Sequence, residues 1–486
     1  MSIASKILLN PTVRLRWDSC GVIVSSLLDA YQVHILDPIT ATFLVLSSEN
    51  EDITKICREI ANIYNVDMSV IRLRDIISRF KGYFYHVGKY RRRFKLPSVE
   101  ELLEKPLDNV LLKRYLHLQS LPKLSSPISI TYCPTFRCPL KCIYCYASTQ
   151  QPKEQERTLS LERMKEIILD AAEQGVFALQ VSGGEPLLEV EKVLEVIKEA
   201  SSRGIYTEIS TKYPVSESLA SEIKNSGIDK VQVSVDSLNP SIQDKLTGVM
   251  GSSKWLMDSV INLVSKNIRV QTNTVITSLN IEGIPQLVKT MLELGVSVIA
   301  LSPYGLSVKR PREDLKPSYS QYKYLLAELY TLFKQYKECE VLEKGTVIIK
   351  DENVQGVVNF MSILMQLRIL EGDGWNVMHE ISCGAYRIGV AILPDGRVVG
   401  CDRMASLPFL EYFVVGDLKL QNLKEIFNSP RAKLLSFPPR ELYQNTICFY
   451  CNEFEACRAR GFCYLDAYFV SQKPLGPRLF CPHLKG

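Results

Sequence analysis

Cys138, Cys142 and Cys145 are three thiols in one short segment, with three residues between the first two and two residues between the last two. Cysteines grouped in this way are candidate metal ligands. A [4Fe–4S] cluster ordinarily takes four cysteines, so a set of three leaves one iron open to bind another molecule. Metal sites with an open position do chemistry, whereas closed sites mostly hold structure. We expect the ring of Tyr144 to lie against this site. A structural zinc knuckle is the alternative interpretation.

The spacing of the triplet resembles the signature of the radical S-adenosylmethionine (SAM) enzymes. A second segment, Gly183-Gly184-Glu185-Pro186, resembles the GGEP motif by which that family holds the methionine amino group of SAM. Glycines let a backbone approach a ligand closely, and a carboxylate accepts hydrogen bonds from an ammonium group. A plain tight turn is the alternative for this segment. The resemblance implies that the triplet holds a [4Fe–4S] cluster whose open iron binds SAM, and that the four residues of the motif contact SAM.

Residues 125–310 alternate between predicted helices and predicted strands. Strands are expected at 177–181, 206–210, 230–236, 268–276 and 296–302, and a helix over 160–174 has Ser160 as its expected N-cap. Repeated strand–helix units predict a parallel sheet, in which active residues collect at the carboxyl ends of the strands. The family resemblance implies that this α/β segment is a partial (β/α)6 radical SAM barrel.

Polar residues stand at several of these strand ends. By position Ser234 and Asp236 resemble the family's residues for the carboxylate and ribose of SAM, as does the segment 210–212 on the strand before. A helix cap is the alternative for Asp236. Asn273 and Asn280 resemble polar positions often seen on or after the fifth strand, and a turn or cap explains Asn280 equally well.

Seven of the fourteen cysteines lie in the last hundred or so residues, and a hairpin turn is predicted at 393–396 between the first two of them. The group resembles the SPASM domain, a seven-cysteine extension that binds two auxiliary iron–sulfur clusters. One spacing departs from the family, because five residues separate Cys457 and Cys463 where three are usual. The resemblance assigns one cluster to Cys448, Cys451, Cys457 and Cys481, and the other to Cys383, Cys401 and Cys463.

The second of these clusters lacks a clear fourth cysteine, since Cys339 is distant in the sequence. We therefore expect either an open iron or a ligand that is not a cysteine. Two zinc sites are the alternative for the whole group, because zinc accepts tetrahedral thiolates well. Asp402 directly follows Cys401, and in some SPASM enzymes an aspartate here takes the substrate proton. We expect the neighbouring anionic cluster to raise the pKa of Asp402, as suits a base. A surface residue that closes the hairpin is the alternative.

The first 90 residues predict a small separate domain. Strands are expected at 8–11, 13–17, 22–28 and 31–36, helices at 39–47, 52–65 and 69–82, and a last strand at 83–87. This winged-helix pattern resembles the PqqD-like element that binds the leader of a precursor peptide as an added strand. A DNA-binding winged helix is the alternative, although the helix over 69–82 is not rich in exposed basic residues beyond Arg72, Arg74 and Arg79. A basic run at 89–95 is either a solvated linker or a clamp for an acidic peptide.

Length and composition are those of a globular protein of roughly three domains. The predicted order is a recognition domain over 1–90, a linker over 91–124, the radical SAM core over 125–310, a bridging region over 311–375 and the SPASM domain over 376–486. We expect a cytoplasmic protein, because the chain holds no run of 18 apolar residues and no secretory signal. A net charge of +5 on 486 residues does not by itself indicate nucleic acid as a partner.

The resemblance implies an enzyme that modifies a ribosomally synthesised peptide through a 5′-deoxyadenosyl radical, forming an intrapeptide thioether or carbon–carbon crosslink. Its expected cofactors are SAM, one SAM-binding [4Fe–4S] cluster and two auxiliary iron–sulfur clusters. Its expected partners are a precursor peptide with a leader and an electron donor of the ferredoxin or flavodoxin type. The alternatives are the same chemistry on a protein side chain or a tetrapyrrole, an electron carrier with three clusters, and a redox-sensing transcription factor.

Overall fold

The computed structural model describes residues 13–18, 21–26, 29–48, 52–65, 76, 123–147, 158–305, 307–308, 311–342, 345–351, 354–380 and 383–484. By its internal contacts the chain divides into two compact units, residues 1–127 and residues 128–486. Four predictions lie largely or wholly outside the described residues: the strands at 8–11 and 83–87, the helix over 69–82 and the basic run at 89–95. Most of the linker over 91–124 lies outside them as well.

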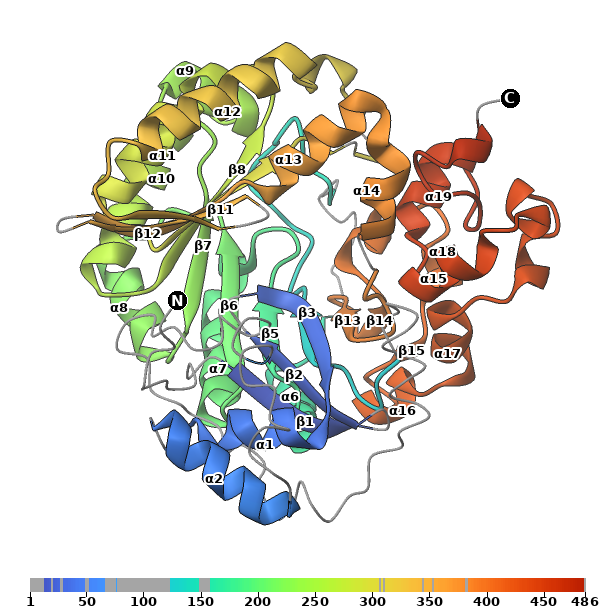
Figure 1. The fold of residues 1–486 in the computed structure, drawn as a ribbon. Helices are drawn as coiled ribbons and strands as arrows, with labels where there is room; N and C mark the ends of the chain where they lie inside the picture. The colour runs from blue at the N-terminus through green and yellow to red at the C-terminus, as the bar shows by residue number, and fades with distance from the viewer. Residues whose placement is uncertain are drawn as a thin grey trace. The chain divides into compact units, whose positions relative to one another are not determined.

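The first unit contains an antiparallel sheet of three strands in the order β1-β2-β3 (Figure 1). These strands are β1 (Val13–Asp18), β2 (Gly21–Ser26) and β3 (Asp29–Leu36), and they are followed by helices α1 (Pro38–Leu46) and α2 (Ile53–Tyr64). Asp52 caps α2 by accepting a hydrogen bond from Thr54 N–H at 2.9 Å. One face of α2 is buried at Ile53, Ile56 and Ile60, which pack with α1 and the sheet. Burial of each such side chain stabilises the folded state by about 1.5–3 kcal/mol. The strands predicted at 13–17, 22–28 and 31–36 and the helices predicted at 39–47 and 52–65 are confirmed.

Within the described residues the second unit is organised by a sheet of twelve strands, in which six strands of the strand–helix repeat pair in parallel and are flanked by one further parallel strand on each side. These six are β4 (Ser129–Tyr132), β5 (Ala178–Val181), β6 (Tyr206–Thr211), β7 (Lys230–Ser234), β8 (Val270–Ile276) and β9 (Val298–Pro303). Five of them match the strands expected from the sequence, and the parallel α/β architecture is confirmed. Their carboxyl ends point to one edge of the sheet, where polar residues of different strands meet.

Helices connect the parallel strands and cover the sheet (Figure 1). They are α6 (Leu161–Glu173), α7 (Val190–Ser202), α8 (Glu217–Asn225), α9 (Pro240–Thr247), α10 (Ser252–Ser265), α11 (Ile284–Glu293) and α12 (Tyr319–Phe333). Ser160 caps α6 as predicted, because its hydroxyl accepts from Arg163 N–H at 3.1 Å. The apolar face of α6 is buried at Met164, Ile167 and Ile168, as its helical spacing requires.

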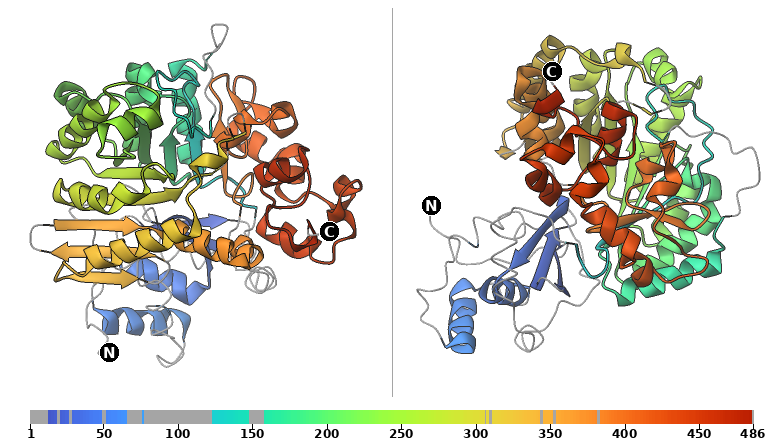
Figure 2. Two further views of the ribbon diagram at one scale, coloured as in Figure 1. Left: turned by 90° about the horizontal axis from the view of Figure 1, so that it is seen from above. Right: turned by 90° about the vertical axis from the view of Figure 1, so that its right-hand side faces the viewer.

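An antiparallel extension, drawn in orange in Figure 2, continues the sheet beyond β9. It consists of β10 (Cys339–Leu342), β11 (Thr346–Asp351) and β12 (Val354–Asn359), and β12 pairs in parallel with β9. Helices α13 (Met361–Arg368) and α14 (Gly374–Glu380) follow. The sequence predicts this part only as a bridging region, so its strands are a finding of the structure.

The other end of the sheet carries the cysteine-rich region. Strand β13 (Gly389–Ile392) pairs in parallel with β4, and β14 (Arg397–Val399) pairs back in the predicted hairpin, with β15 (Gly416–Asp417) at the edge. Short helices follow these strands: η7 (Asp402–Ser406), α15 (Leu410–Phe413), α16 (Leu423–Phe427), α17 (Pro430–Ser436), η9 (Ile447–Tyr450), α18 (Phe454–Arg460) and α19 (Tyr464–Ser471).

A buried arginine holds this region together. The Arg387 guanidinium donates to three carbonyl oxygens from two different helices, those of Ser436, Arg458 and Ala459. Burial lowers the pKa of Arg387 to about 10. Strand β14 runs antiparallel to β13, and Asp402 begins the short helix η7 that follows it. In the parts of the chain that the structure describes, no helix is long and apolar enough to cross a bilayer.

Candidate active site

A cavity of about 450 Å³ lies at the carboxyl ends of the parallel strands. Residues of three kinds line it: the three thiols of the triplet, the first three residues of the GGEP segment, and polar residues at strand ends. The strand-end residues include Ser210, Lys212, Ser234 and Asn273, and the hairpin adds Asp402 and Arg403. The structure therefore brings most of the predicted site residues to one cavity, although they come from distant parts of the sequence.

The loop that carries the triplet is fixed to the end of α9 by backbone hydrogen bonds. Lys141 N–H donates to Thr247 O at 2.9 Å, and Ile143 N–H donates to Leu246 O at 3.0 Å. Gly248 ends α9 with a φ of +69°, and a Cβ there would lie 2.8 Å from Lys141 O. The thiols thus face the cavity from a loop whose backbone is held by hydrogen bonds to the end of α9.

The environment of the thiols fits an iron–sulfur cluster. Burial raises the pKa of Cys138 to about 12, the Leu140 N–H opposes this, and Glu185, Cys142 and Cys145 raise the pKa further. Burial also raises the pKa of Cys142, and the Lys212 ammonium lowers it. Thiols in such a place become thiolates only when a cation compensates them, and metal binding supplies that compensation by displacing the protons. Each cysteine of a [4Fe–4S] cluster binds a different iron. No three His, Cys, Asp or Glu side chains among the described residues are arranged to hold a single metal ion.

The two glycines of the GGEP segment make room for the chain that leads into the triplet. A Cβ on Gly184 would lie 2.2 Å from Arg137 O, and one on Gly183, whose φ is +114°, would lie 2.8 Å from Thr135 O. Gly184 N–H donates to Thr135 O and Glu185 N–H donates to Arg137 O, both at 2.8 Å. Close approach of a ligand is the reason that the sequence suggests for these glycines. The structure gives them a second reason, which is close approach of the backbone just before Cys138.

We predict that Gly184→Ala prevents assembly of the cluster on the triplet, because the new methyl group displaces residues 136–137 and with them Cys138. Gly283→Ala is the matched control, since a Cβ there meets open space. Iron per chain in the reconstituted protein is the measurement. The expected loss is about one third, on the basis of three four-iron clusters. Full iron content and normal SAM binding in Gly184→Ala would show that the loop tolerates the displacement.

Glu185 lines the cavity, but its carboxylate already has protein partners. Oε1 accepts from Leu187 N–H at 3.1 Å and from the Thr211 hydroxyl at 2.6 Å, while Oε2 accepts from Lys212 N–H at 2.9 Å. Burial raises the pKa of Glu185, and these hydrogen bonds oppose the rise. A contact of Glu185 with SAM stays a prediction, and Pro186 begins the turn η3 (Pro186–Glu189) outside the cavity lining.

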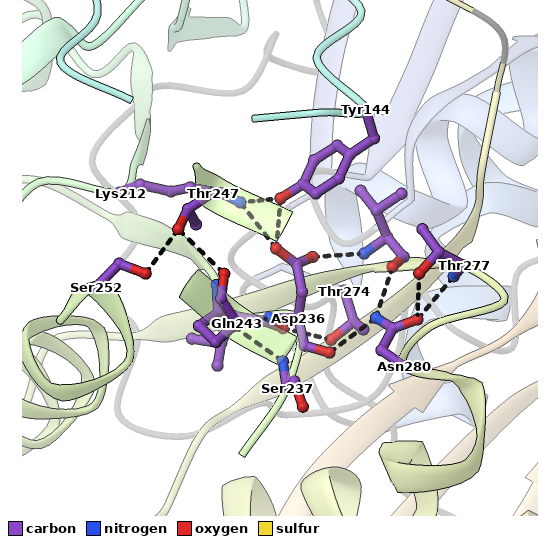
Figure 3. A network of polar contacts seen from close by, with 12 residues as sticks. Tyr144, Lys212, Asp236, Ser237, Gln243, Thr247, Ser252, Thr274, Thr277 and Asn280 are labelled. Atoms are coloured by element: carbon purple, nitrogen blue, oxygen red, sulfur yellow. Dashed lines mark hydrogen bonds and ion pairs between the residues drawn. The ribbon is translucent and has the colours of Figure 1, made fainter. Parts of the chain in front are cut away.

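Asp236 lies in a buried network rather than on the cavity wall (Figure 3). Its side chain is fully buried, with Oδ2 accepting from the Tyr144 hydroxyl and from Lys212 Nζ, the latter at 2.9 Å. Its Oδ1 accepts from Val275 N–H at 2.9 Å. Asn280 donates to Asp236 O at 2.8 Å and also to Val275 O. Direct contact of Asp236 with SAM stays a prediction; in this structure its side chain positions Tyr144 and Lys212.

Lys212 gives the cavity a positive charge beside the triplet. Burial alone would lower the pKa of Lys212, but Asp236 and then Cys142 raise it above the usual value. The ammonium group also lies over the ring of Tyr144, 4.8 Å from its centroid. Removing one partner of a buried ion pair costs about 3–5 kcal/mol, so Lys212 and Asp236 depend on each other. Tyr144 thus lines the cavity as expected, and its hydroxyl is held by this pair.

Hydroxyl and amide groups at the strand ends complete a lining that fits a polar cofactor. Ser210 Oγ is buried against the cavity and has no hydrogen-bond partner, and Ser234 lies on the next strand. Asn273 accepts a hydrogen bond from Ser302 at 2.9 Å. Gln180 and Gln232 also belong to this lining and were not among the predicted site residues. Each stands two residues before a lining serine, so the two-residue period of a strand would have placed them on the same face.

Asp402 reaches the cavity beside the residue that follows the triplet. Its Oδ2 accepts from the Tyr146 hydroxyl at 2.9 Å, and its Oδ1 accepts from Arg403 N–H at 2.9 Å. The Cys401 thiol lies 3.5 Å from the same Oδ1. The Asp402 carboxylate and burial raise the pKa of Tyr146 well above its usual value, so this hydroxyl remains a donor. Asp402 therefore stands between the triplet loop and Cys401, and its role as a base stays a prediction.

The sulfurs of the cysteine-rich region fall into two groups. Burial raises the pKa of Cys448 to about 11, the Thr446 hydroxyl opposes the rise, and Cys481 and Cys451 add to it. Burial raises the pKa of Cys457 to about 12, Arg478 opposes this, and Cys451, Cys481 and Cys448 add to it. These four thiols act on one another electrostatically, and their assignment to one cluster stays a prediction. In the second group burial is the largest cause that raises the pKa values of Cys401 and Cys463, and Cys383 raises both further.

Comparison with known families agrees with this geometry. A model described as the radical SAM superfamily matches residues 132–294, and a model described as an iron–sulfur cluster-binding domain, SPASM, matches residues 383–452. The chain is therefore a radical SAM enzyme with a SPASM domain. Its cofactors are SAM, the [4Fe–4S] cluster of radical SAM enzymes and auxiliary iron–sulfur clusters.

Several proteins are similar over most of the chain. The PqqA peptide cyclase of Rhizobium meliloti is 25% identical over 365 residues, which cover 71% of this chain and 85% of that protein. The mycofactocin maturase MftC of Mycolicibacterium smegmatis is 24% identical over 365 residues, covering 74% and 83%. The crystal structure of Streptococcus suis SuiB bound to S-adenosylmethionine has a TM-score of 0.62 at 16% identity and covers 96% of this chain and 97% of SuiB. The fold thus matches over nearly the whole length.

Proposed function

We propose that this enzyme crosslinks a ribosomally synthesised precursor peptide. The observation that carries the proposal is the combination of a cavity lined by the triplet and by Asp402 with a small N-terminal sheet in the same chain. Relatives named as a peptide cyclase and a maturase support it, as does the SuiB fold, for which a structure bound to the precursor peptide SuiA matches with a TM-score of 0.61.

The bound cofactors would supply a 5′-deoxyadenosyl radical, which takes a hydrogen atom from the peptide. They would also supply an iron–sulfur cluster that accepts the electron that the peptide then loses. The protein has three tasks around that chemistry. Lys212, Ser210 and Ser234 present polar groups to the cofactor, and Tyr144 closes one side of the cavity. Asp402 accepts the proton that the peptide loses when the new bond forms, which balances the electron and the hydrogen atom. The electron enters from a ferredoxin- or flavodoxin-type donor, and the reducing cytoplasm suits a chain with ten ligand thiols.

The first unit would bind the leader of the peptide. Both outer strands of its three-stranded sheet, β1 and β3, pair on one side only within the described residues, and a sheet edge offers backbone donors and acceptors to an added strand. Leader binding raises the effective concentration of the core peptide at the cavity. A leader thus provides affinity without any need for tight contacts at the reacting residues.

We predict that removing residues 1–127 leaves SAM cleavage unchanged and lowers crosslinking of a leader-bearing precursor by about 100-fold, from the loss of effective concentration. The substrate is to be sought among the short open reading frames beside the gene for this protein. A leaderless core peptide is the control, because the full chain and the shortened chain are expected to process it equally slowly. Equal rates of the two enzymes on the leader-bearing precursor would contradict leader binding by this unit.

A second candidate is the same radical chemistry on a tetrapyrrole. The Fe-coproporphyrin III synthase of Methanosarcina barkeri is 25% identical over 326 residues, which cover 66% of this chain and 78% of that protein. The N-terminal sheet and helices favour the peptide, since a tetrapyrrole has no leader to bind. Production of 5′-deoxyadenosine that rises with a tetrapyrrole and not with the precursor peptide would select this candidate.

A further inference from the structure

Among the described residues, the cavity lining holds two cationic side chains, Lys212 and Arg403, and they differ in their partners. Lys212 is ion-paired with Asp236, at 2.9 Å between Nζ and Oδ2, and also donates to the Tyr144 hydroxyl. Within the same described residues the Arg403 guanidinium forms no ion pair and no hydrogen bond, and its Nε is buried. The protein thus balances the charge of Lys212 with a carboxylate of its own, whereas it provides Arg403 with no such partner in this part of the chain.

Two neighbours hold the Arg403 guanidinium at the cavity. Its central carbon lies 5.5 Å from the centroid of the Tyr146 ring, which is a cation–π contact. On another side the guanidinium approaches Gly305, because a Cβ on that glycine would lie 3.9 Å from Arg403 Nη2. Tyr146 follows the triplet, Gly305 follows β9, and both line the cavity. The guanidinium therefore reaches from the cysteine-rich region to a cavity wall formed by two other parts of the chain.

The adjacent carboxylate does not neutralise Arg403. Asp402 Oδ2 accepts from the Tyr146 hydroxyl at 2.9 Å, and Oδ1 accepts from the backbone N–H of Arg403 rather than from its guanidinium. Tyr146 thus holds both side chains, the carboxylate through its hydroxyl and the guanidinium through its ring. The two groups stand side by side at one corner of the cavity without forming an ion pair with each other.

The residues predicted to contact SAM belong to other segments. Residues 183–186 follow β5, and the segment 210–212 and Ser234 stand at the ends of β6 and β7. The contacts of the Arg403 guanidinium are instead with the segment after the triplet and with the segment after β9. Arg403 is therefore placed for a group of the substrate rather than for the methionine part of SAM.

A carboxylate is the group that fits this guanidinium. Arg403 is partly buried, and a charge that loses hydration without a partner is costly. The planar fork of N–H donors matches a carboxylate in two parallel hydrogen bonds. We propose that Arg403 binds a carboxylate of the peptide substrate, from an acidic side chain or from the C-terminus, and so holds the core peptide beside Asp402. This proposal rests on the proposed function, and it requires a carboxylate in the crosslinked segment of the peptide.

Compensation of negative charge in the cysteine-rich region is the competing role for Arg403, which stands two residues after Cys401. Burial raises the pKa of Asp466, and the charges of Arg478 and then Arg403 oppose the rise. A counter-charge of this kind would act on the assembly or the reduction potential of an auxiliary cluster and would not distinguish one peptide from another. The two roles therefore differ in what removal of the guanidinium changes.

The test measures, by ligand-observed nuclear magnetic resonance, the binding of tripeptide probes to the full-length enzyme that is loaded with its clusters and saturated with SAM. Acetyl-Gly-Glu-Gly-amide carries only a side-chain carboxylate, acetyl-Gly-Gln-Gly only a C-terminal one, and acetyl-Gly-Gln-Gly-amide neither. We expect one of the carboxylate probes to bind about tenfold more tightly than the neutral probe, and the preferred probe identifies the source of the carboxylate.

Arg403→Gln is expected to remove this preference and to leave the iron content and the affinity for SAM unchanged. Arg397→Gln is the matched control and is expected to keep the preference, because Arg397 belongs to the same hairpin but pairs with Asp395 and Glu411. Both variants exchange an arginine for a neutral side chain of similar length. Only the one at the cavity should alter the binding of the probes.

Equal binding of the probes, binding of none of them, or a preference that persists in Arg403→Gln would overturn the proposal. Loss of iron or of SAM affinity in Arg403→Gln would overturn it as well, because the guanidinium would then serve a cluster or the cofactor. The measurement requires no crosslinking. Failure of the proposed function, seen as the absence of crosslinked product from a precursor peptide, is therefore distinguishable from failure of this assignment.

Discussion

Replacing Cys138, Cys142 and Cys145 together by alanine is expected to abolish SAM cleavage while the auxiliary clusters remain. The three thiols lie on one loop, whose backbone is hydrogen-bonded to Leu246 and Thr247 of α9. These hydrogen bonds do not involve the cysteine-rich region. The cysteines of that region lie at 383–481, in a different part of the chain from this loop. Loss of one cluster should therefore leave the others assembled.

The expected decrease in iron is about one third, if three four-iron clusters are present in the unaltered protein. Production of 5′-deoxyadenosine, in the presence of a chemical reductant, is the activity measurement. Cys339→Ala is the control, because this cysteine lies in β10 and belongs to neither group. Undiminished 5′-deoxyadenosine from the triple variant would refute the assignment of the triplet, and loss of all iron would refute the independence of the clusters.

The position of the site was predictable because it follows from the topology of a parallel sheet. Alternating helices and strands predict such a sheet, and its strand ends must meet at one edge. Ser210, Ser234 and Asn273 were accordingly found in one cavity with the triplet. The hairpin at 393–396 was also predictable from its turn residues. The sequence did not reveal that β13 would pair with β4, nor that Asp402 would line that cavity.

The parts that could not be predicted are contacts between side chains far apart in the chain. Asp236 stands at a strand end, as a ligand-binding residue would, yet its carboxylate is bound by Tyr144, Lys212 and the backbone of Val275. Local sequence cannot distinguish such a residue from a helix cap.

Asp402→Asn is expected to lower peptide crosslinking by about 100-fold or more, the usual effect of removing a general base, while SAM cleavage continues. An amide in this position keeps the shape of the side chain and can still accept from the Tyr146 hydroxyl or Arg403 N–H, but it cannot take a proton from the peptide. Hydrogen abstraction precedes that proton transfer. The variant should therefore form 5′-deoxyadenosine without a matching amount of crosslinked product.

The ratio of crosslinked peptide to 5′-deoxyadenosine, measured by mass spectrometry and chromatography, separates this role from a structural one. Asp395→Asn is the matched control, because this aspartate belongs to the same hairpin but pairs with Arg397 at its turn. Tyr146→Phe should have a smaller effect, since it removes only a donor to the carboxylate. A parallel fall in 5′-deoxyadenosine and product would indicate damage to the cofactor site, and an unchanged ratio in Asp402→Asn would exclude Asp402 as the proton acceptor. Because Asp402 directly follows Cys401, iron content must match the unaltered protein before either result is interpreted.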